Sequence, residues 1–473
     1  MNGDGPAQGD GLTQSLEKLR ADGAGEAAVA TFRSFARRLA CGESGLLRED
    51  EIEPVGTLPD AEGLPEPDAE AAAALLDATI VLKLNGGLGT SMGMTRAKAL
   101  LDVKEGLSFL DVIARQVRDL RRRHGERPRL PLVLLDSFHT REDSLAALAR
   151  YGPLSADLPA DVVQNRFPKL RDDGSLAPVT WPADPELEWA PPGHGDLYAV
   201  LQSSGLLDAA LERGYRWLFA SNADNLGATL DPRILAFLAG ERISFLMEVA
   251  ERTAADRKGG HLARRAGGGA LVLREVAQTA PQDMEAFQDV ARHRYFNTNS
   301  IWLDLRALAG LLGERGGVLG LPMIVNRKTV DPTEPGSPPV IQLESAMGAA
   351  IDVFEGAGAL GVPRTRFLPV KTTDDLLVLR SDAYALIDDC RLELDPRRGG
   401  VAPLVQLDAD RYRLLADFES RFPAGPPSLL ECERLTVRGD VRFGGGVVVR
   451  GAVTIDHEGP GQLVIPDGTP LQG

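Results

Sequence analysis

Cysteine is scarce in this chain of 473 residues, which contains Cys41, Cys390 and Cys432 and no C-x-x-C pair. An odd number of widely spaced cysteines does not suit a disulfide framework or a cysteine metal centre, so reduced thiols are expected. The first residues, MNGDGPAQGDG, lack the basic and apolar parts of a signal peptide. Apolar runs long enough to cross a bilayer are also missing. These absences predict a cytoplasmic protein with no membrane partner.

Basic residues are fewer than acidic ones. Lys and Arg number 52 against 68 Asp and Glu, which gives a formal charge of −16. Such a surface repels nucleic-acid backbones and anionic lipids, so no nucleic-acid partner is expected. An enzyme of this charge that binds a polyphosphate must gather its cations, or a metal ion, at the site.

The length predicts two or three structural units. Residues 1–70 are expected to form a helical extension and an acidic linker. A frayed start up to about Leu12 precedes helical patterns at residues 15–21 and 26–39. From Gly42 to about Glu70 the composition is acidic and contains prolines, which is typical of an extended connection.

Residues 71–385 are predicted to form an α/β catalytic domain. Apolar, β-rich runs alternate with helical patterns: TIVLKL at 79–84, PLVLLD at 131–136, WLFAS at 217–221 and SFLMEVA at 244–250. Near-continuous apolar strands between helices indicate a doubly wound, mainly parallel sheet covered on both faces. Ligands bind beyond the carboxyl ends of such strands, so the loops that follow these runs are the candidate sites.

Residues 386–473 are predicted to hold a connection and a separate small β unit. Leu435, Val441, Val447 and Val453 recur every six positions, as do Val437, Phe443, Val449 and Ile455. A six-residue period indicates a short β-solenoid, in which each turn buries its apolar side on the next. Alternating hairpins explain the same pattern equally well.

A glycine-rich stretch from Leu84 to Gly93 follows the first apolar run. Its glycines permit close backbone approach, so that successive N–H groups can converge on a polyphosphate. The spacing fits neither a Walker sequence nor a dinucleotide-binding fingerprint, which disfavours a nicotinamide-dependent dehydrogenase. A tight strand-to-helix turn is the alternative. Lys98 follows closely and favours the anion-binding interpretation.

Three further motifs suggest ligand contacts. Asp224, in SNADNLGA after WLFAS, is placed to hold Mg²⁺ against phosphates, although an Asn/Asp turn is the simpler interpretation of this motif alone. His194, between two glycines in PPGHGDLY, is either a ligand contact or an ordinary hydrogen-bonding histidine. Lys371, before a Thr-Thr-Asp cap, is either a fixed cation or a surface lysine.

Taken together, these motifs resemble the UTP–glucose-1-phosphate uridylyltransferases of the eukaryotic type. The matching stretches occur in the family's order between Thr79 and Asp382: LKLNGGLGTSMG, QNRFPKL, PPGHGDLY, SNADNLGA, KGGHLA with REVAQ, FNTNSIW, VIQLESAMGAAI and PRTRFLPVKTTDDLLVLRSD. The resemblance implies a Rossmann-like nucleotidyltransferase domain with a mixed, mainly parallel sheet. It also implies a small, left-handed β-helix-like unit at the C-terminus.

The resemblance carries site residues with it. It implies that UTP contacts Leu84, Asn85, Gly86, Gly87, Lys98, Gln164, Gly193 and Lys371, with Gln164 and Gly193 at the uracil. It implies that the sugar phosphate contacts Gly86, Gly87, His194, Asn222, Ala223, Asp224, Glu275, Asn297 and Asn299. Asp224 is the implied Mg²⁺ ligand, and Lys98, Lys371 and Asp224 are the implied catalytic groups.

The implied reaction is Mg²⁺-dependent attack by glucose 1-phosphate on the α-phosphorus of UTP. Two departures bear on substrate preference: Met94-Thr95-Arg96-Ala97-Lys98 lacks the family's usual proline, and Ser345 and Met347 replace small residues. The alternatives are a relative that acts on another sugar 1-phosphate, including an N-acetylhexosamine, and a non-catalytic nucleotide-binding protein. A homo-oligomer through the C-terminal β unit is a further candidate property.

Overall fold

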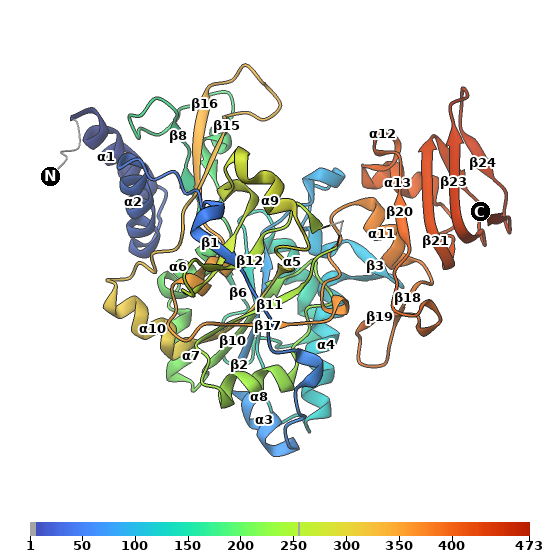
Figure 1. Cartoon of the computed structure of the whole chain (residues 1–473), viewed down its shortest axis with the longest axis horizontal. Helices are drawn as coiled ribbons and strands as arrows, with labels where there is room; N and C mark the ends of the chain where they lie inside the picture. The colour runs from blue at the N-terminus through green and yellow to red at the C-terminus, as the bar shows by residue number, and fades with distance from the viewer. Residues whose placement is uncertain (1–5, 254–255) are drawn as a thin grey trace.

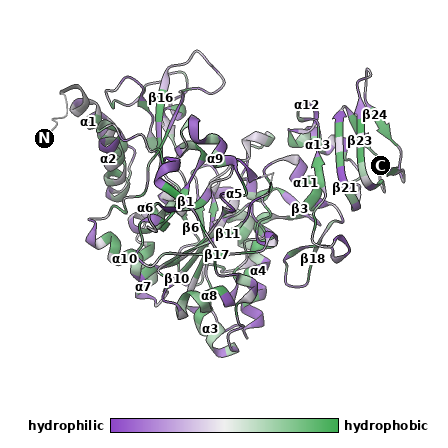
Figure 2. Ribbon diagram, in the orientation of Figure 1, coloured by the Kyte–Doolittle hydropathy of each residue, from purple (hydrophilic) through white to green (hydrophobic). Residues whose placement is uncertain are grey.

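The computed structural model describes residues 6–253 and 256–473. Figure 1 shows three regions along the long axis of the molecule: a helical pair at the N-terminus, a central α/β body and a β unit at the C-terminus. Hydrophobic residues concentrate in the central strands, while the outer faces of the surrounding helices are hydrophilic (Figure 2). Among the described residues, no helix is both long enough and apolar enough to cross a membrane.

The central body is built on a mixed ten-stranded sheet with the order β1-β12-β14-β10-β2-β5-β6, while β11, β13 and β17 pair off this path. One run of neighbouring parallel strands consists of β2 (Thr79–Asn85), β5 (Leu132–Asp136), β6 (Asp161–Val163) and β10 (Trp217–Asn222). These strands include three of the predicted apolar runs. The mixed α/β fold expected from the sequence is therefore confirmed.

The fourth predicted run forms β11 (Phe245–Glu251), but it does not pair with β10. Instead β14 (Tyr295–Asp304) lies between the two and is antiparallel to both. The sheet continues through β12 (His261–Arg265), β13 (Leu271–Arg274) and β17 (Gly358–Gly361). A buried strand is apolar whichever direction it runs, so the sequence pattern did not reveal this antiparallel insertion.

Alternate residues of the strands pack on opposite faces of the sheet. Val81 of β2 contacts the layer that contains α3 (Ala69–Asp77), α4 (Phe109–Arg123) and α8 (Pro232–Gly240). Ile80 and Leu82 contact the other layer, with α6 (Leu197–Ser203), α7 (Leu206–Glu212) and α10 (Leu305–Glu314). This alternation follows from the two-residue period of a strand, and it fixes which side chains can reach a ligand at the strand ends.

The N-terminal region is more ordered than the sequence suggested. The frayed start expected up to Leu12 is wrong from Pro6 onward, because α1 (Pro6–Ala21) begins there, and residues 1–5 lie outside the described part. With α2 (Glu26–Ala40), α1 packs on the small sheet of β15 (Ile324–Thr329), β16 (Pro339–Glu344) and β8 (Leu170–Arg171). The acidic connection contains β1 (Ile52–Pro54), which pairs with β12. The boundary at residue 70 remains a prediction.

The C-terminal unit contains two stacks of parallel strands. One is β20 (Leu404–Gln406), β21 (Ser428–Gly439), β23 (Val448–His457) and β25 (Pro470–Gln472), and the other is β22 (Val441–Phe443) with β24 (Leu463–Ile465). Leu435 lies beside Val453, three six-residue periods further along the chain. Strands joined as hairpins would be antiparallel, so the hairpin alternative is wrong for residues 404–472. The periodic apolar residues Leu435, Val441, Val447 and Val453 are all buried.

Shorter elements complete the chain. The remaining helices are α5 (Arg141–Leu148), α9 (Met284–Gln288), α11 (Thr373–Arg380), α12 (Ala409–Tyr412) and α13 (Leu415–Arg421). The remaining strands are β3 (Asp102–Lys104), β4 (Leu107–Ser108), β7 (Phe167–Pro168), β9 (Trp189–Ala190), β18 (Tyr384–Leu386) and β19 (Leu392–Leu394). The second predicted boundary, at residue 385, falls within β18 and also remains a prediction.

Candidate active site

A cavity of about 370 Å³ lies at the carboxyl ends of β2, β5 and β10. This is where doubly wound sheets bind their ligands. Ala99, Leu135 and Pro191 form part of the wall. The rest of the wall consists of sequence-predicted site residues: Leu84, Asn85, Gly86, Gly87, Lys98, Gln164, Gly193, His194, Asn222, Ala223 and Asp224. The fold thus brings together motifs that are distant in the sequence.

The glycine-rich loop forms one wall of this cavity. Gly89 and Gly93 have left-handed backbone conformations, with φ of 67° and 72°. The backbone N–H of Lys98 donates to the carbonyl of Gly87 at 2.9 Å, which closes the loop. The segment leads into short 3-10 turns at Thr90–Met92 and Lys98–Leu100, not directly into an α-helix. The loop therefore does not form the tight strand-to-helix turn that was the alternative interpretation of its glycines.

Asn85 is fixed by groups that the sequence analysis did not identify. Its Nδ2 donates to Asp136 Oδ1 at 2.6 Å and to Ser144 Oγ at 2.7 Å. Both amide hydrogens are used, so the amide oxygen remains to accept a hydrogen bond. Burial raises the pKa of Asp136 to about 6 despite the hydrogen bonds from Asn85 and Thr140. In the sequence, the clue to Asp136 was its place at the end of the apolar run PLVLLD. The structure pairs it with Asn85 of β2 in the sheet.

Lys98 and Asp224 form an ion pair, with Nζ 2.5 Å from Oδ2. Both side chains are partly buried, so the pair is screened less than a surface ion pair. Asp224 is a single carboxylate, and no group of three or more acidic, histidine or cysteine ligands occurs within the described residues. Mg²⁺ suits such a site, because it binds through one or two carboxylates together with phosphate oxygens and water. The residues present therefore fit Mg²⁺ held jointly by Asp224 and a bound phosphate.

Gln164 and Gly193 approach each other across the cavity. Gln164 Nε2 donates to the carbonyl of Gly193 at 3.2 Å. Gly193 has φ of 75°, and a Cβ at this position would come within 2.4 Å of the Ser345 carbonyl oxygen. Gly195 N–H donates to the same oxygen at 2.9 Å. The motif around His194 therefore needs its glycines because the segment at Ser345 packs directly against its backbone.

His194 is held with one ring nitrogen facing the protein. Nδ1 accepts a hydrogen bond from the Met347 N–H at 2.9 Å. Burial lowers the pKa of His194 to about 4. The ring is therefore neutral at neutral pH, with its proton on Nε2. A neutral N–H donor suits a hydroxyl or phosphate oxygen of a ligand.

The segments that carry Asp224 and Lys371 are joined by Asn225. The Asn225 Oδ1 accepts from Leu368 N–H at 2.8 Å, and its Nδ2 donates to the Arg366 carbonyl at 3.2 Å. Val370 N–H donates to the Asp224 carbonyl at 3.3 Å. Lys371 is exposed and does not line the cavity, but this pairing places it next to Asp224. Sequence analysis missed Asn225, although it directly follows the predicted metal ligand.

The remaining predicted residues, Glu275, Asn297 and Asn299, do not line the cavity. Asn297 Nδ2 donates to Asn299 Oδ1 at 2.9 Å, and Asn299 N–H donates back to Asn297 Oδ1 at 2.9 Å. Asn299 has φ of 58° at an irregularity in the β11–β14 pairing. Burial raises the pKa of Glu275, and the charge of Lys371 opposes that rise. Strained backbone of this kind is concentrated at functional sites.

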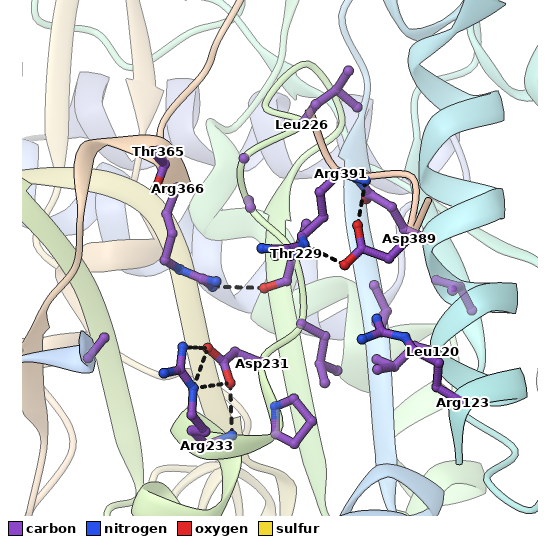
Figure 3. Close-up of a pocket in the computed structure, with 18 of the residues that line it drawn as sticks. Leu120, Arg123, Leu226, Thr229, Asp231, Arg233, Thr365, Arg366, Asp389 and Arg391 are labelled. Carbon is purple, nitrogen blue, oxygen red and sulfur yellow. Dashed lines mark hydrogen bonds and ion pairs between the residues drawn. The ribbon is translucent and has the colours of Figure 1, made fainter. Parts of the chain in front are cut away.

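A larger cavity, of about 770 Å³, is lined in part by residues 226–233, which follow Asp224, and by Thr365 and Arg366, which precede Lys371 (Figure 3). Several of its charged groups already have partners. Arg233 binds Asp231, Arg391 binds Asp389, and Arg366 Nη2 donates to the Thr229 carbonyl. Apolar residues of α4, including Val117 and Leu120, form part of the wall. Size therefore does not identify the active site, because the smaller cavity is where the polar groups converge.

Comparison with known proteins gives a consistent picture. A family model described as UTP–glucose-1-phosphate uridylyltransferase matches residues 29–450. The chain is 37% identical over 467 residues to the UTP–glucose-1-phosphate uridylyltransferase of Hordeum vulgare, covering 98% of this chain and 95% of the barley protein. It is 40% identical over 399 residues to a probable enzyme of the same name from Schizosaccharomyces pombe, covering 84% of this chain and 76% of that protein.

Solved structures agree with these sequence matches. The UDP-glucose pyrophosphorylase of Leishmania major, known in open and closed structures, superposes with a TM-score of 0.91 at 46% identity, over 98% of both chains. A UDP-glucose phosphorylase of Trypanosoma brucei superposes with a TM-score of 0.88 at 45% identity, again over 98% of both chains. The similarity thus extends over nearly the whole chain in sequence and in fold.

Proposed function

The chain belongs to the UTP–glucose-1-phosphate uridylyltransferase family, and we propose that it converts UTP and glucose 1-phosphate to UDP-glucose and pyrophosphate. The observation that carries this proposal is the cavity in which the glycine-rich loop, Gln164, His194 and the Lys98–Asp224 pair converge. One wall suits a polyphosphate and the other a polar sugar. Relatives with this name and a 46% identical structural neighbour support the same reaction.

The reaction is an in-line displacement at the α-phosphorus of UTP. A phosphate oxygen of glucose 1-phosphate forms a new P–O bond while the bond to the pyrophosphate oxygen breaks, and pyrophosphate leaves. The attacking oxygen is already anionic, so no general base or covalent intermediate is needed. Catalysis then consists of alignment and charge neutralisation, as in other phosphoryl-type transfers.

Each group of residues contributes one part of that task. Backbone N–H groups of the loop from Leu84 and Asn85 to Gly86 and Gly87 hold the UTP phosphates, and Gln164 and Gly193 contact the uracil. Lys98 and Lys371 neutralise charge that is redistributed in the transition state. Asp224 holds Mg²⁺, which supplies charge neutralisation at the phosphate oxygens when bound.

The sugar phosphate occupies the other side of the cavity. His194, as a neutral Nε2–H donor, and the segment Asn222–Ala223 face the sugar or its phosphate. Glu275, Asn297 and Asn299 contact the sugar hydroxyls. Asn297 and Asn299 hold each other in place, which preorganises this pocket before the sugar enters.

Three further properties belong to this proposal. The C-terminal unit is a left-handed β-helix-like unit, which its parallel strands and six-residue period support. This unit also provides the surface for a homo-oligomer. The protein acts in the cytoplasm on small-molecule substrates, and its net charge of −16 argues against nucleic acid as a partner.

A direct assay tests the proposal. Purified protein is incubated with UTP, Mg²⁺ and a panel of sugar 1-phosphates that includes glucose, galactose and N-acetylglucosamine, and pyrophosphate release is followed. The expected result is fastest turnover with glucose 1-phosphate and formation of UDP-glucose. Fastest turnover with another sugar would favour a UDP-sugar or N-acetylhexosamine enzyme, and no release with any sugar would favour a non-catalytic nucleotide-binding protein.

A further inference from the structure

Glu49 lies in the linker before β1, far along the sequence from the proposed sugar pocket, yet its carboxylate is the centre of a charged cluster. Arg274 Nη1 donates to Glu49 Oε2 at 2.5 Å, and Arg292 Nε donates to Oε1 at 2.7 Å. His293 Nε2 lies 3.1 Å from the same Oε1. The backbone N–H of Glu49 donates to Asp283 Oδ2 at 3.0 Å, and Arg274 Nη2 binds that oxygen too.

The linker holds the chain on both sides of Glu275. Arg274, which directly precedes it, is bound by the Glu49 carboxylate. Gln278, three residues after it, accepts from the Leu47 N–H through its carbonyl at 2.8 Å. Gln278 also returns to Glu275, because its Oε1 accepts from the Glu275 N–H at 3.1 Å. The position of the Glu275 backbone therefore depends on two contacts with the linker.

Glu275 in turn packs against Gly260, which directly precedes β12 and is hydrogen-bonded to the strand that carries the other two proposed sugar-pocket residues. A Cβ at Gly260 would come within 2.4 Å of a Glu275 carboxylate oxygen. The carbonyl of Gly260 accepts from the Asn297 N–H at 3.0 Å. A shift of Glu275 would therefore displace Asn297. It should not displace the glycine-rich loop or Gln164, because they lie on other elements.

The charge of Glu49 is strongly compensated. Burial acts to raise its pKa, but hydrogen bonds from Arg292, His293 and Arg274 outweigh burial and lower it. The side chain of Arg274 is fully buried, with 0% exposure. If the Glu49 charge is removed, Asp283 is the one ionic partner that this buried guanidinium keeps within the described residues. Loss of the Glu49 charge would therefore favour a rearrangement around Arg274, because burying an incompletely paired charge costs free energy.

We propose that Glu49 is a positioning residue for the sugar half of the active site: it holds Arg274, and through it Glu275, in the geometry that binds the glucosyl group. This role rests on the proposed function. It predicts that the linker controls affinity for the sugar substrate and leaves affinity for the nucleotide nearly unchanged.

The test compares Glu49→Gln with the wild type by calorimetric binding of UDP-glucose and of UDP, and by the separate KM values for the two substrates. Glu49→Gln should weaken UDP-glucose binding and raise the KM for glucose 1-phosphate by about 3- to 30-fold, the usual range for a residue that acts through others. UDP binding and the KM for UTP should change by less than about twofold. A general loss of stability would move all four quantities together.

Two further variants complete the test. Glu51→Gln alters a carboxylate in the same turn that binds the Arg48 N–H, and it should change none of the four quantities. Arg292→Gln removes a partly exposed contact to Glu49, so it should fold even if Glu49→Gln does not, and it should show a smaller shift of the same kind. Equal weakening of UDP and UDP-glucose, or no change in either, would overturn the positioning role. A wild type that binds UDP-glucose no better than UDP would instead overturn the proposed function.

Discussion

At the scale of single residues, the ion pair between Lys98 and Asp224 is the most informative contact in the cavity. The sequence assigned the two residues to separate partners, a phosphate and a metal ion. The structure places them 2.5 Å apart. They therefore act as one unit whose charges are balanced before a ligand enters. Their roles in catalysis remain predictions.

Asp224→Asn tests the metal role. The amide keeps the size of the side chain but loses the charge, so the Mg²⁺ concentration for half-maximal activity should rise at least about tenfold and kcat should fall by about 10²-fold. Both are measured by pyrophosphate release during a Mg²⁺ titration. Asp456→Asn, which disturbs an exposed pair with Arg438 in the C-terminal unit, is the matched control and should leave the titration unchanged. An unaltered titration in Asp224→Asn would refute the assignment.

His194 links the site to pH. Its folded-state pKa of about 4 lies below the ordinary value of 6.5, so the unfolded chain binds more protons between these two values. The stability that the neutral ring contributes is therefore complete above pH 6.5 and is lost as the pH falls toward 4.

The expected consequence is a difference between wild type and His194→Gln in urea unfolding. On going from pH 7.5 to pH 5, the wild type should lose about 1–2 kcal/mol more free energy of unfolding than the variant. Other buried groups titrate in both proteins and cancel in the comparison. Equal losses in the two proteins would show that the ring is not held neutral in the folded state.

At the scale of elements, the proposed catalytic groups depend on two loops that are fastened side by side. The loop after β10 carries Asp224, and the loop before α11 carries Lys371. Asn225 is 2% exposed and bridges the two through Leu368 and Arg366. The distance between the proposed metal ligand and the proposed phosphate cation is thus set by a neutral side chain.

Asn225→Ala should separate these loops. Leaving buried backbone groups without partners should lower the free energy of unfolding by about 1–3 kcal/mol. The kcat should fall by about 10- to 100-fold, because Lys371 is no longer held in a fixed position relative to Asp224. Denaturant unfolding and steady-state kinetics measure the two effects. Arg233→Gln, in the first turn of α8 after the same loop and lining the larger cavity, should change stability by less than about 1 kcal/mol and leave kcat intact. A kcat equal to that of the wild type in Asn225→Ala would show that Asn225 does not position Lys371 relative to Asp224.

At the scale of the whole molecule, the catalytic body and the C-terminal β unit share one hydrophobic core. A single contiguous cluster includes Leu134 of β5, Leu376 of α11, Tyr412 of α12 and Val441 of β22. Tyr412 Oη also donates to the Val441 carbonyl at 2.5 Å, and its carbonyl accepts from Thr373 Oγ1 at 2.8 Å. The β unit is therefore anchored to the helix that directly follows Lys371.

This continuity predicts cooperative unfolding. Phe443 is fully buried and stacks on Phe422 with ring centroids 4.9 Å apart. Phe443→Ala should lower the free energy of unfolding by about 3–5 kcal/mol, because a large buried side chain leaves a cavity. Scanning calorimetry should show one transition at a lower temperature. A separate early transition, with activity retained above it, would show that the β unit unfolds independently.

The sequence by itself determined the features that depend on local patterns. Apolar runs located β2, β5 and β10, and the six-residue period located the buried side chains of the C-terminal unit. The glycine-rich loop and the separate motifs around Gln164, His194 and Asp224 each identified part of the cavity wall. These features depend on residues that are close in the chain, so one sequence contains enough information to find them.

Only the tertiary structure decided how distant segments meet. It placed β14 between β10 and β11, brought β1 of the linker into the central sheet, paired Lys98 with Asp224 and joined Asn225 to the loop before Lys371. It also showed that the glycine-rich loop belongs to the smaller of the two cavities described above, where the predicted polar site residues converge. Each of these outcomes depends on contacts between residues far apart in the chain, and a single sequence does not record which of them become neighbours.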